Sequence, residues 1–530
     1  MRHHLAKLTP VVLGGCSLLY NPNNIKPPPA DASDAQMVDA EMMADAEIDA
    51  PPIIDVDPTM LAVMDAWPPV IYEGQGVDNS GKAMLIIKGA HFAADATVSV
   101  SPMTDLTLDT PVVSAHHDYI AVPITFAISA TDTGLVPLTI TVNETGATAQ
   151  SLPNKVSVQY LKKLTNPALT LPLEARYSQV ALTGTPTFAG DLTQPVIIRS
   201  VSSITCATNG TASFNAKGAN GTNTNKGAGG PGGCPGGDEG SPGGCAAPLV
   251  GGGGSSSGAN GGGGGGFGTM GANGGSPGGA GHGTVAILSY TGSDPMGADR
   301  NQASGGGGGT ADGLILVTGG GGGGGGGGSV EMTAGGDIKC GGIDVSGGNG
   351  ANGAGTLTGG TGGGGGGAGG LVLLRTDRGS ITGAAMTANG GGGGNHANGG
   401  GGSNGGAGGS GRMRVDTAGT TVPTATPSLL LHRGLSFASS TMPIYTTASP
   451  MVTLVGTPGD VFDMYVIDGA GAVREGEPKN QTMDGSGSMS LQVTLIAGYN
   501  RLCATIRPGV RNTTDRFSLA DTCIELTYLP

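Results

Sequence analysis

The residues with the most specific chemistry in this chain are its seven cysteines. Cys16 lies near the start, and the other six lie far from it, between positions 206 and 523. Paired cysteines are typical of chains that are exported to an oxidising compartment. A zinc site is not expected, because no Cys-x-x-Cys spacing and no nearby histidine completes a tetrahedral ligand set. We therefore predict disulfides and no metal.

The sequence around the cysteines indicates which of them pair. The candidates are Cys503 with Cys523, Cys234 with Cys245, and Cys206 with Cys340. In the first pair, each cysteine interrupts an alternation of apolar residues, so both lie on the strand face opposite the apolar one and suit a cross-strand disulfide. The second pair would close a short loop rich in Gly and Pro. The third pair follows by elimination.

Charged residues in the middle of the chain form the second group with possible chemistry. They are Asp312, Asp337, Asp344, Asp377, Arg375 and Arg378. A polysaccharide lyase or hydrolase needs two or three carboxylates, or a carboxylate with Arg or Lys, on one face. Asp344 could lie beside Asp312 in such a site, but scattered surface charge explains these residues equally well. We expect no catalytic residues, no cofactor and no enzymatic activity, and a β-helical polysaccharide lyase or hydrolase is the alternative.

The elements that would position these side chains are rich in glycine. Residues 201–416 contain 85 of the 106 glycines, and Gly319–Gly328 is an unbroken run. A long glycine tract normally indicates a flexible linker. Here, however, short apolar runs recur between the tracts, namely Leu314–Val317, Leu371–Leu374 and Met413–Val415. We therefore predict a folded structural module.

An irregular repeat supports this interpretation. The three copies are Val196–Ile198 with Ser203–Thr205 and Phe214–Gly218; Gly313–Val317 with Gly336–Lys339 and Ile343–Gly348; and Gly370–Leu374 with Gly379–Thr382 and Met386–Gly391. Stacking such copies would bury their apolar faces, as in a parallel β-helix or related solenoid. The glycine tracts would be long loops that pack as extended polyglycine helices. We place this β-solenoid region at residues 165–417; it resembles the glycine-rich β-helical segments of bacterial surface proteins.

The segments on either side of this region predict β-sandwiches. Residues 67–164 contain short apolar runs separated by Gly, Pro, Asn and Asp. They resemble the IPT/TIG family of immunoglobulin-like domains at Pro69-Val70-Ile71, Gly81, Leu85-Ile86-Ile87, Gly89 with Phe92, and Gly134 with Leu138-Thr139-Ile140-Thr141-Val142. Residues 425–530 have the same strand pattern, and Leu495–Leu502 resembles the strand entry of bacterial Ig-like repeats. An unrelated β-sandwich is the alternative there.

The N-terminus predicts a membrane anchor. A basic head is followed by a short apolar stretch and by Leu13-Gly14-Gly15-Cys16, which resembles the lipobox of bacterial lipoproteins. The resemblance implies a signal peptide at residues 1–15 and lipidation of Cys16. Residues 16–66 are rich in Pro, Asp, Glu and Ala, so we expect a disordered acidic stalk after the anchor. An ordinary N-terminal strand with an unrelated cysteine is the alternative.

Composition limits the partners and the role. The net charge is −14 and no cluster of Lys and Arg is present, so nucleic-acid partners are disfavoured. No apolar run reaches the roughly 18 residues that span a bilayer. We predict a mainly β, lipid-anchored cell-envelope protein with a structural or adhesive role, located in the outer membrane and exposed at the cell surface. Its expected partners are the membrane and a surface polysaccharide or protein; a periplasm-facing binding or assembly module is a further alternative.

Overall fold

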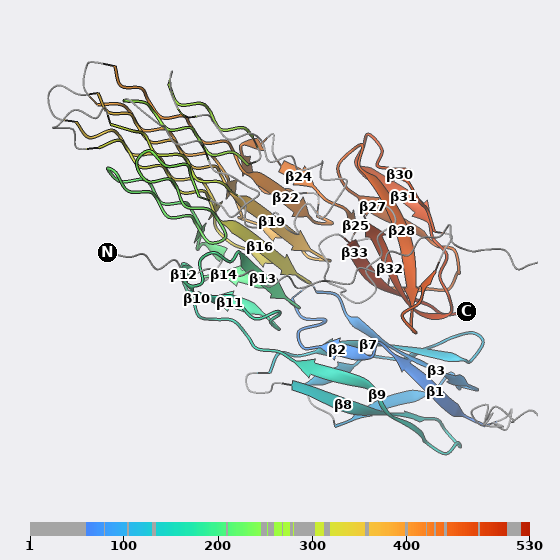
Figure 1. Cartoon of the computed structure of the whole chain (residues 1–530). Coiled ribbons are helices and arrows are strands. Elements are labelled where there is room, and N and C mark those ends of the chain that lie inside the picture. The colour runs from blue at the N-terminus through green and yellow to red at the C-terminus, as the bar shows by residue number, and fades with distance from the viewer. Residues whose placement is uncertain are drawn as a thin grey trace, which may run out of the picture. The chain divides into compact units, whose positions relative to one another are not determined.

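The computed structural model describes residues 60–78, 80–102, 105–129, 134–207, 210–244, 252, 259–267, 269–275, 279, 303–311, 319–355, 360–397, 401–419, 421–428, 431–438, 443–474, 477–505 and 521–530. All of them belong to one compact unit, residues 56–530. Within this part, the chain forms strands and no helix, so the expected mainly β class is confirmed (Figure 1). The expected signal peptide (1–15), Cys16 and most of the expected stalk lie outside the described residues.

Two sheets around one apolar core form the N-terminal domain. One sheet has the order β1-β3-β7-β5, with β6 also paired to β7, and the other has the order β2-β9-β8-β4. The bounds are β1 (Ala62–Trp67), β2 (Val70–Tyr72), β3 (Ala83–Ala90), β4 (Thr97–Ser101), β5 (Leu106–Leu108), β6 (Val112–Val113), β7 (Tyr119–Phe126), β8 (Gly134–Asn143) and β9 (Gln150–Tyr160). Strand β1 begins inside the segment expected to be stalk, because Leu61 and Ala66 are buried in this core.

The residues that carried the family resemblance lie at structurally demanding positions of this domain. Phe92 is fully buried in the core. Its ring lies so close to Gly89 that an added Cβ there would be 2.3 Å from the ring. Gly81 has a φ of +73°, a conformation that side chains rarely adopt. The glycines of this domain therefore provide both turn geometry and room for Phe92.

The central domain is built from successive coils of the chain, and we refer to it as the coil stack. Three parallel sheets run along it, with the orders β11-β14-β17-β20, β13-β16-β19-β22-β24 and β15-β18-β21-β23, and a short sheet pairs β10 with β12. The bounds are β10 (Ala168–Leu171), β11 (Val180–Leu182), β12 (Thr187–Gly190), β13 (Val196–Ser200), β14 (Ile204–Cys206), β15 (Phe214–Asn215), β16 (Ser329–Ala334), β17 (Ile338–Lys339), β18 (Ile343–Asp344), β19 (Leu371–Thr376), β20 (Ile381–Thr382), β21 (Met386–Thr387), β22 (Arg412–Asp416), β23 (Ala425–Thr426) and β24 (Leu431–Arg433). Each full coil gives one strand to each of the three sheets.

The register within the stack corrects one copy of the predicted repeat. Strand β19 pairs with β16, with Val372 opposite Val330. The first strand of the second repeat copy is therefore Ser329–Ala334, and not Leu314–Val317 as the sequence predicts. Residues 312–318 lie outside the described residues. An apolar-run criterion misses β16 because Glu331 and Thr333 alternate with its core residues. The stack also continues beyond the expected boundary at 417, since β24 pairs with β22.

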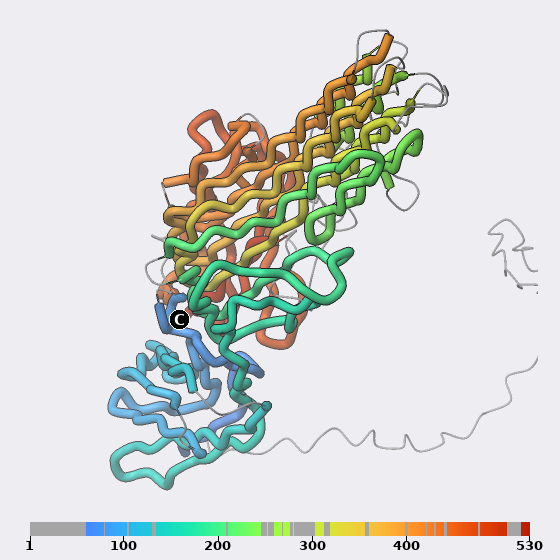
Figure 2. Tube along the Cα trace, turned by 90° about the vertical axis from the view of Figure 1, so that its left-hand side faces the viewer, coloured from blue at the N-terminus to red at the C-terminus, as the bar shows by residue number. Residues whose placement is uncertain are grey.

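The glycine tracts leave the coils as long extended segments that pack side by side, as both views show (Figures 1 and 2). We call the described glycine-rich residues between 216 and 411 the glycine lattice. Along Gly319–Gly328, successive N–H groups donate to three different neighbouring segments in turn, with N–O distances of 2.5–2.9 Å. The donor–acceptor sets are Gly321, Gly324 and Gly327 to Gly362, Gly365 and Ala368; Gly322, Gly325 and Gly328 to Asn223, Ala219 and Ala216; and Gly323, Gly326 and Ser329 to Gly237, Cys234 and Pro231. This repeat of three residues is that of the polyproline II helix, which has no internal hydrogen bonds.

Many glycines of the lattice have no room for a side chain. A Cβ added to Gly324 would lie 2.0 Å from the carbonyl oxygen of Gly348, and one added to Gly325 would lie 1.9 Å from that of Ala228. Ordering a glycine costs roughly 0.5–1 kcal/mol more than ordering an alanine. A backbone hydrogen bond contributes a net stabilisation of about 0.5–1.5 kcal/mol, so one bond per residue offsets this cost. The backbone itself therefore fills the role that side chains have in other cores.

The C-terminal domain consists of two further sheets around an apolar core. Their orders are β25-β27-β31 and β26-β33-β32-β28-β29, with β30 paired to β28. The bounds are β25 (Ser436–Phe437), β26 (Ile444–Tyr445), β27 (Met451–Val455), β28 (Val461–Asp468), β29 (Val473–Arg474), β30 (Gln481–Thr482), β31 (Ser488–Gln492), β32 (Gly498–Thr505) and β33 (Asp521–Tyr528). The domain thus begins after β24, later than the expected residue 425.

Candidate functional site

The structure contains disulfides between Cys206 and Cys340 and between Cys503 and Cys523. Cys503 lies directly opposite Cys523 on β32 and β33, on the face away from the domain core, as the strand alternation predicts. That face is not open to solvent at this point, because Cys503 is fully buried beside Tyr465 and Ile467. Cys234 is also disulfide-bonded, and Cys245 lies outside the described residues, as does Cys16.

The six charged residues considered for catalysis do not form one site. Asp344 lies on β18, where it accepts hydrogen bonds from Ser346 and pairs with Lys217 at 2.8 Å. Asp312 lies outside the described residues. The other four residues lie near the ends of β16 and β19, where the chain turns into the next strand. Two pockets at these turns share Arg378, which lies beside Asp377 in one and beside Asp337 in the other.

Asp337 is held in its ionised form by its neighbours. Its carboxylate accepts hydrogen bonds from the backbone N–H and the hydroxyl of Ser380, at 2.8 and 3.1 Å, and lies 3.1 Å from the ammonium of Lys339. Burial alone would raise the pKa of Asp337, but these hydrogen bonds outweigh it and the pKa lies below its ordinary value. A carboxyl group in this environment is a poor proton donor at neutral pH.

A loop of the N-terminal domain reaches the coil stack at these same turns. The carboxylate of Asp78 accepts hydrogen bonds from the side chains of Gln179 (2.7 Å) and Ser203 (2.8 Å), both of which belong to the stack. Gly81 packs on the aliphatic part of Arg378, where an added Cβ would lie 2.4 Å from Cδ. We call residues 73–82 the docking loop.

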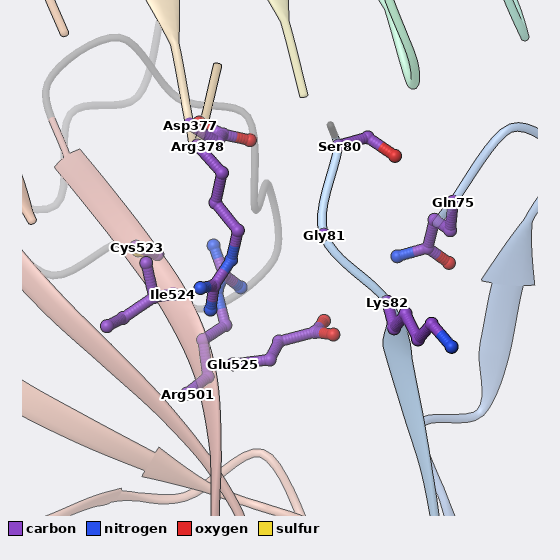
Figure 3. A pocket seen from close by; sticks show the side chains of 10 residues that line it. All are labelled: Gln75, Ser80, Gly81, Lys82, Asp377, Arg378, Arg501, Cys523, Ile524 and Glu525. Carbon is purple, nitrogen blue, oxygen red and sulfur yellow. The ribbon is translucent and has the colours of Figure 1, made fainter. Parts of the chain in front are cut away.

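A pocket lies where the docking loop, the coil stack and the C-terminal domain meet (Figure 3). We call it the junction pocket, and it has a volume of about 70 Å³. Its lining residues are Gln75, Ser80, Gly81, Lys82, Asp377, Arg378, Arg501, Cys523, Ile524 and Glu525. Figure 3 shows the side chains of Arg378 and Arg501 pointing toward one another from opposite walls. Two of the sequence candidates, Asp377 and Arg378, thus belong to one pocket, and Asp337 lines a neighbouring cavity that shares Gly81 and Arg378.

Several charges around the junction pocket are matched by neighbours. Lys82 pairs with Asp109, and Asp377 lies 3.6 Å from the guanidinium of buried Arg375. Glu525 stands directly opposite Arg501 in the β32–β33 register and accepts a hydrogen bond from the hydroxyl of Tyr499 at 3.1 Å. Arg378, Arg501 and Glu525 take part in further interactions, so the charged side chains of this pocket have partners within the protein.

Sequence reasoning missed Lys82, Arg501 and Glu525, because each comes from a different domain than the glycine-rich coils. The sequence could have indicated only that Arg501 and Glu525 lie close together. The alternation along β32 and β33 puts both residues on the same face as the two cysteines. That face was predicted to be the outer face of the domain, but no pattern in the sequence indicates which other domain covers it.

A larger cavity of about 340 Å³ lies between the N-terminal and C-terminal domains. Its aromatic lining residues are Trp67, Tyr119 and Tyr499. These side chains also belong to the apolar cluster that joins the two domains, and Gly469 packs against the indole of Trp67. We therefore attribute this cavity to the rim of a domain contact.

The described residues contain no group of three His, Cys, Asp or Glu side chains that could hold a metal ion. Nor does this part of the chain include a helix long and apolar enough to cross a membrane. Comparison with known proteins found no family model, no curated protein and no solved structure that matches the chain.

Proposed function

We propose that this chain is a lipid-anchored cell-envelope protein with a structural or adhesive role and without catalytic activity. The observation that carries the proposal is the glycine lattice. Its backbone N–H groups are bonded to neighbouring segments, and at many of its glycines, such as Gly324 and Gly325, an added Cβ would collide with neighbouring backbone. Such a core suits a stiff support, and it offers few of the side chains that catalysis requires.

The finer fold assignments belong to the same proposal. We assign the N-terminal domain to an IPT/TIG-like immunoglobulin fold, the coil stack to a parallel β-helix, and the C-terminal domain to an Ig-like sandwich. Two-sheet organisation supports the first and third. The residue-by-residue parallel register from β13 to β24 supports the second.

The anchor and location rest on the lipobox resemblance at Cys16 and on the acidic composition that follows it. Acyl chains on Cys16 would hold the chain in the outer membrane, at about 0.8 kcal/mol per buried methylene. The proposed partners are the membrane, through this anchor, and a polysaccharide or protein of the cell surface. The acidic net charge of −14 disfavours nucleic acid.

Catalysis on polysaccharides is the weaker candidate. Asp337, Asp344 and Asp377 each lie beside a cation or a hydrogen-bond donor. The hydrogen bonds to Asp337 hold the pKa of its carboxyl below the ordinary value, which does not suit a general acid. Loss of polysaccharide cleavage in Asp337→Asn and Asp344→Ala variants, starting from a measurable activity, would favour the enzyme instead.

Protease treatment of intact cells tests the location. An epitope tag after Pro530 is followed by immunoblot, with permeabilised cells and a periplasmic marker as controls. We expect the tag to be lost from intact cells while the marker survives, and a Cys16→Ala variant to leave the membrane fraction. Protection of the tag until permeabilisation would contradict surface display and favour the periplasmic binding or assembly module.

A further inference from the structure

The hydrogen bonds of the glycine lattice point in one direction along the coil stack. We call the segments that follow β15, β18 and β21 the outgoing arms. Each outgoing arm donates its N–H groups to the carbonyl groups of the arm in the following coil. The donor–acceptor pairs are Gly218–Ser346 and Gly221–Asn349 between the first two arms, and Gly347–Asn389 and Gly350–Gly392 between the second and third, at 2.8–2.9 Å.

The segments that run back toward the strands, which we call the return arms, follow the same direction. They comprise residues 225–230, 320–328, 361–370 and 403–411. The pairs that join each return arm to the following one are Gly227–Gly323, Gly324–Gly365 and Gly366–Gly406, at 2.8–2.9 Å. Both kinds of arm therefore give the lattice a first coil that only donates and a last coil that only accepts in this direction.

The two ends of the lattice consequently carry opposite backbone groups. The register assigns the outward carbonyl groups of the first coil to Lys217, Asn220 and Lys226, and we call these three groups the acceptor edge. It assigns the outward N–H groups of the last coil to Gly390, Gly393 and Ala407, which we call the donor edge. Among the described residues, none of these six backbone groups has a hydrogen-bond partner.

The two edges match each other in spacing and in exposure. Donors Gly390 and Gly393 are three residues apart, as are acceptors Lys217 and Asn220, which corresponds to about 9 Å along a polyproline II helix. Lys217, Asn220 and Ala407 are exposed. Figure 2 shows the orange arms of the last coil and the green arms of the first on opposite sides of the yellow arms. Unpaired backbone groups at such an edge are a template for pairing with another chain.

We propose that the donor edge of one copy of this chain pairs with the acceptor edge of a second copy. The pairs would be Gly390 with Lys217, Gly393 with Asn220, and Ala407 with Lys226 of the next copy. Two donor edges cannot pair with each other, so the contact is head-to-tail and leaves one edge of each kind free. The copies would therefore assemble into a row that continues the lattice. This inference goes beyond the display function, and its test does not depend on cellular location.

The Ala407→Pro variant tests the donor edge. Proline has no N–H, and its fixed φ suits a polyproline II segment. Ala407 already carries a Cβ and its N–H has no partner within the protein, so the variant should keep the fold and its unfolding temperature. We expect association to weaken about tenfold or more, because the proline ring removes one donor and occupies the space of the facing carbonyl.

The measurement is sedimentation velocity of the full chain, purified in detergent, across a series of protein concentrations. Ala407→Ser is the matched control, since it changes the same side chain and keeps the N–H. We expect the unchanged chain and the control to form species that grow beyond a dimer with concentration, and Ala407→Pro to lose this growth. A chain that stays monomeric, or that stops at a dimer, or equal growth of both variants would overturn the proposal.

Cysteine cross-linking tests the register between copies. Lys217 and Asn389 occupy equivalent positions on the first and third outgoing arms, so two coil spacings of about 4.8 Å each separate them within one copy. That is beyond the roughly 7 Å limit for a disulfide, whereas between copies a single spacing would separate them. We expect the Lys217→Cys, Asn389→Cys double variant to form a ladder of covalent oligomers on a non-reducing gel.

The matched control pairs Lys217→Cys with Asn395→Cys, which moves one thiol six residues along the same edge. That thiol would lie about 19 Å further along a polyproline II helix, out of reach of its partner. We expect no ladder from this control. Equal ladders from both double variants would show random collision and not the proposed register, and the absence of a ladder from the Asn389→Cys pair would contradict the assembly.

Discussion

At the scale of single residues, the glycine lattice makes the absence of a side chain a packing requirement. A substitution that is mild in most proteins becomes severe where backbones touch, because the displaced atoms belong to the main chain and cannot rotate away. Overpacking of a core typically costs 1–3 kcal/mol, and a contact as short as the one calculated for Gly324 exceeds an ordinary overpacked site.

We therefore predict that Gly324→Ala lowers the free energy of unfolding by about 3 kcal/mol or more. The matched control is Gly485→Ala, because nothing lies within 4 Å of a Cβ at that turn position. The control should be neutral or slightly stabilising. Urea unfolding followed by circular dichroism compares the two variants with the unchanged chain, and equal effects of both substitutions would contradict the lattice.

Asp521 is the first residue of β33, and its contribution to the stability of the fold depends on pH. It is buried, and burial raises the pKa of its carboxyl, although Thr505, Tyr465 and the nearby arginines partly offset this effect. A raised pKa in the folded state means that the neutral acid is favoured there. The stabilisation is thus fully present below the unfolded pKa of about 3.9, and is lost as pH rises through the folded pKa.

The Asp521→Asn variant lacks this titration. We predict that the free energy of unfolding of the unchanged chain, relative to this variant, falls as the pH is raised from about 4 toward 7. Denaturant unfolding of both proteins at matched pH values measures the difference and removes the contribution of the other carboxylates. A difference that stays constant with pH would show that Asp521 does not titrate differently in the folded state.

At the scale of elements, the two described disulfides hold together different lengths of chain. Cys206 and Cys340 join successive coils, on β14 and next to β17, across 134 residues. Cys503 and Cys523 join neighbouring strands across 20 residues. A longer closed loop restricts the unfolded chain more strongly, which favours the first pair by roughly 1–2 kcal/mol in the chain-entropy account.

Replacing Cys206 and Cys340 together by alanine should therefore destabilise the protein more than replacing Cys503 and Cys523. Each double replacement is expected to cost about 2–5 kcal/mol. The midpoints of urea unfolding without reductant give the comparison, and treatment of the unchanged chain with reductant provides the reference. A larger loss for the Cys503–Cys523 pair would argue against the entropic origin of the difference.

Elements were the level that the sequence predicted best. Apolar runs such as Leu371–Leu374 and Met413–Val415 became β19 and β22, because each follows a glycine-rich stretch and supplies apolar side chains to the core. Strand β16 alternates polar and apolar residues from Ser329 to Ala334 and contains no continuous apolar run, so a search for apolar runs missed it. Its polar residues Glu331 and Thr333 are nevertheless buried, and nothing in the sequence indicates that protein covers them.

At the scale of the whole molecule, the sequence predicted the order of the parts but not their contacts. The N-terminal domain meets the coil stack through single residues of the docking loop, as when Asp78 bonds to Gln179 and Ser203. Such contacts leave no periodic trace in a sequence. The junction pocket was unpredictable for the same reason, since Arg378 and Arg501 are distant along the chain and only the folded arrangement brings them together.

The repeat of three residues in the glycine lattice has a consequence for how the gene can change. Each backbone N–H donates to the same neighbouring segment as the N–H three positions away. Adding or removing one residue within a glycine tract would therefore turn every following N–H toward a different segment. Length changes in steps of three residues would preserve all of the remaining pairings. The pairing of the lattice therefore depends on the number of residues in each glycine tract. We expect natural variants of this chain to differ in the length of these tracts by multiples of three residues.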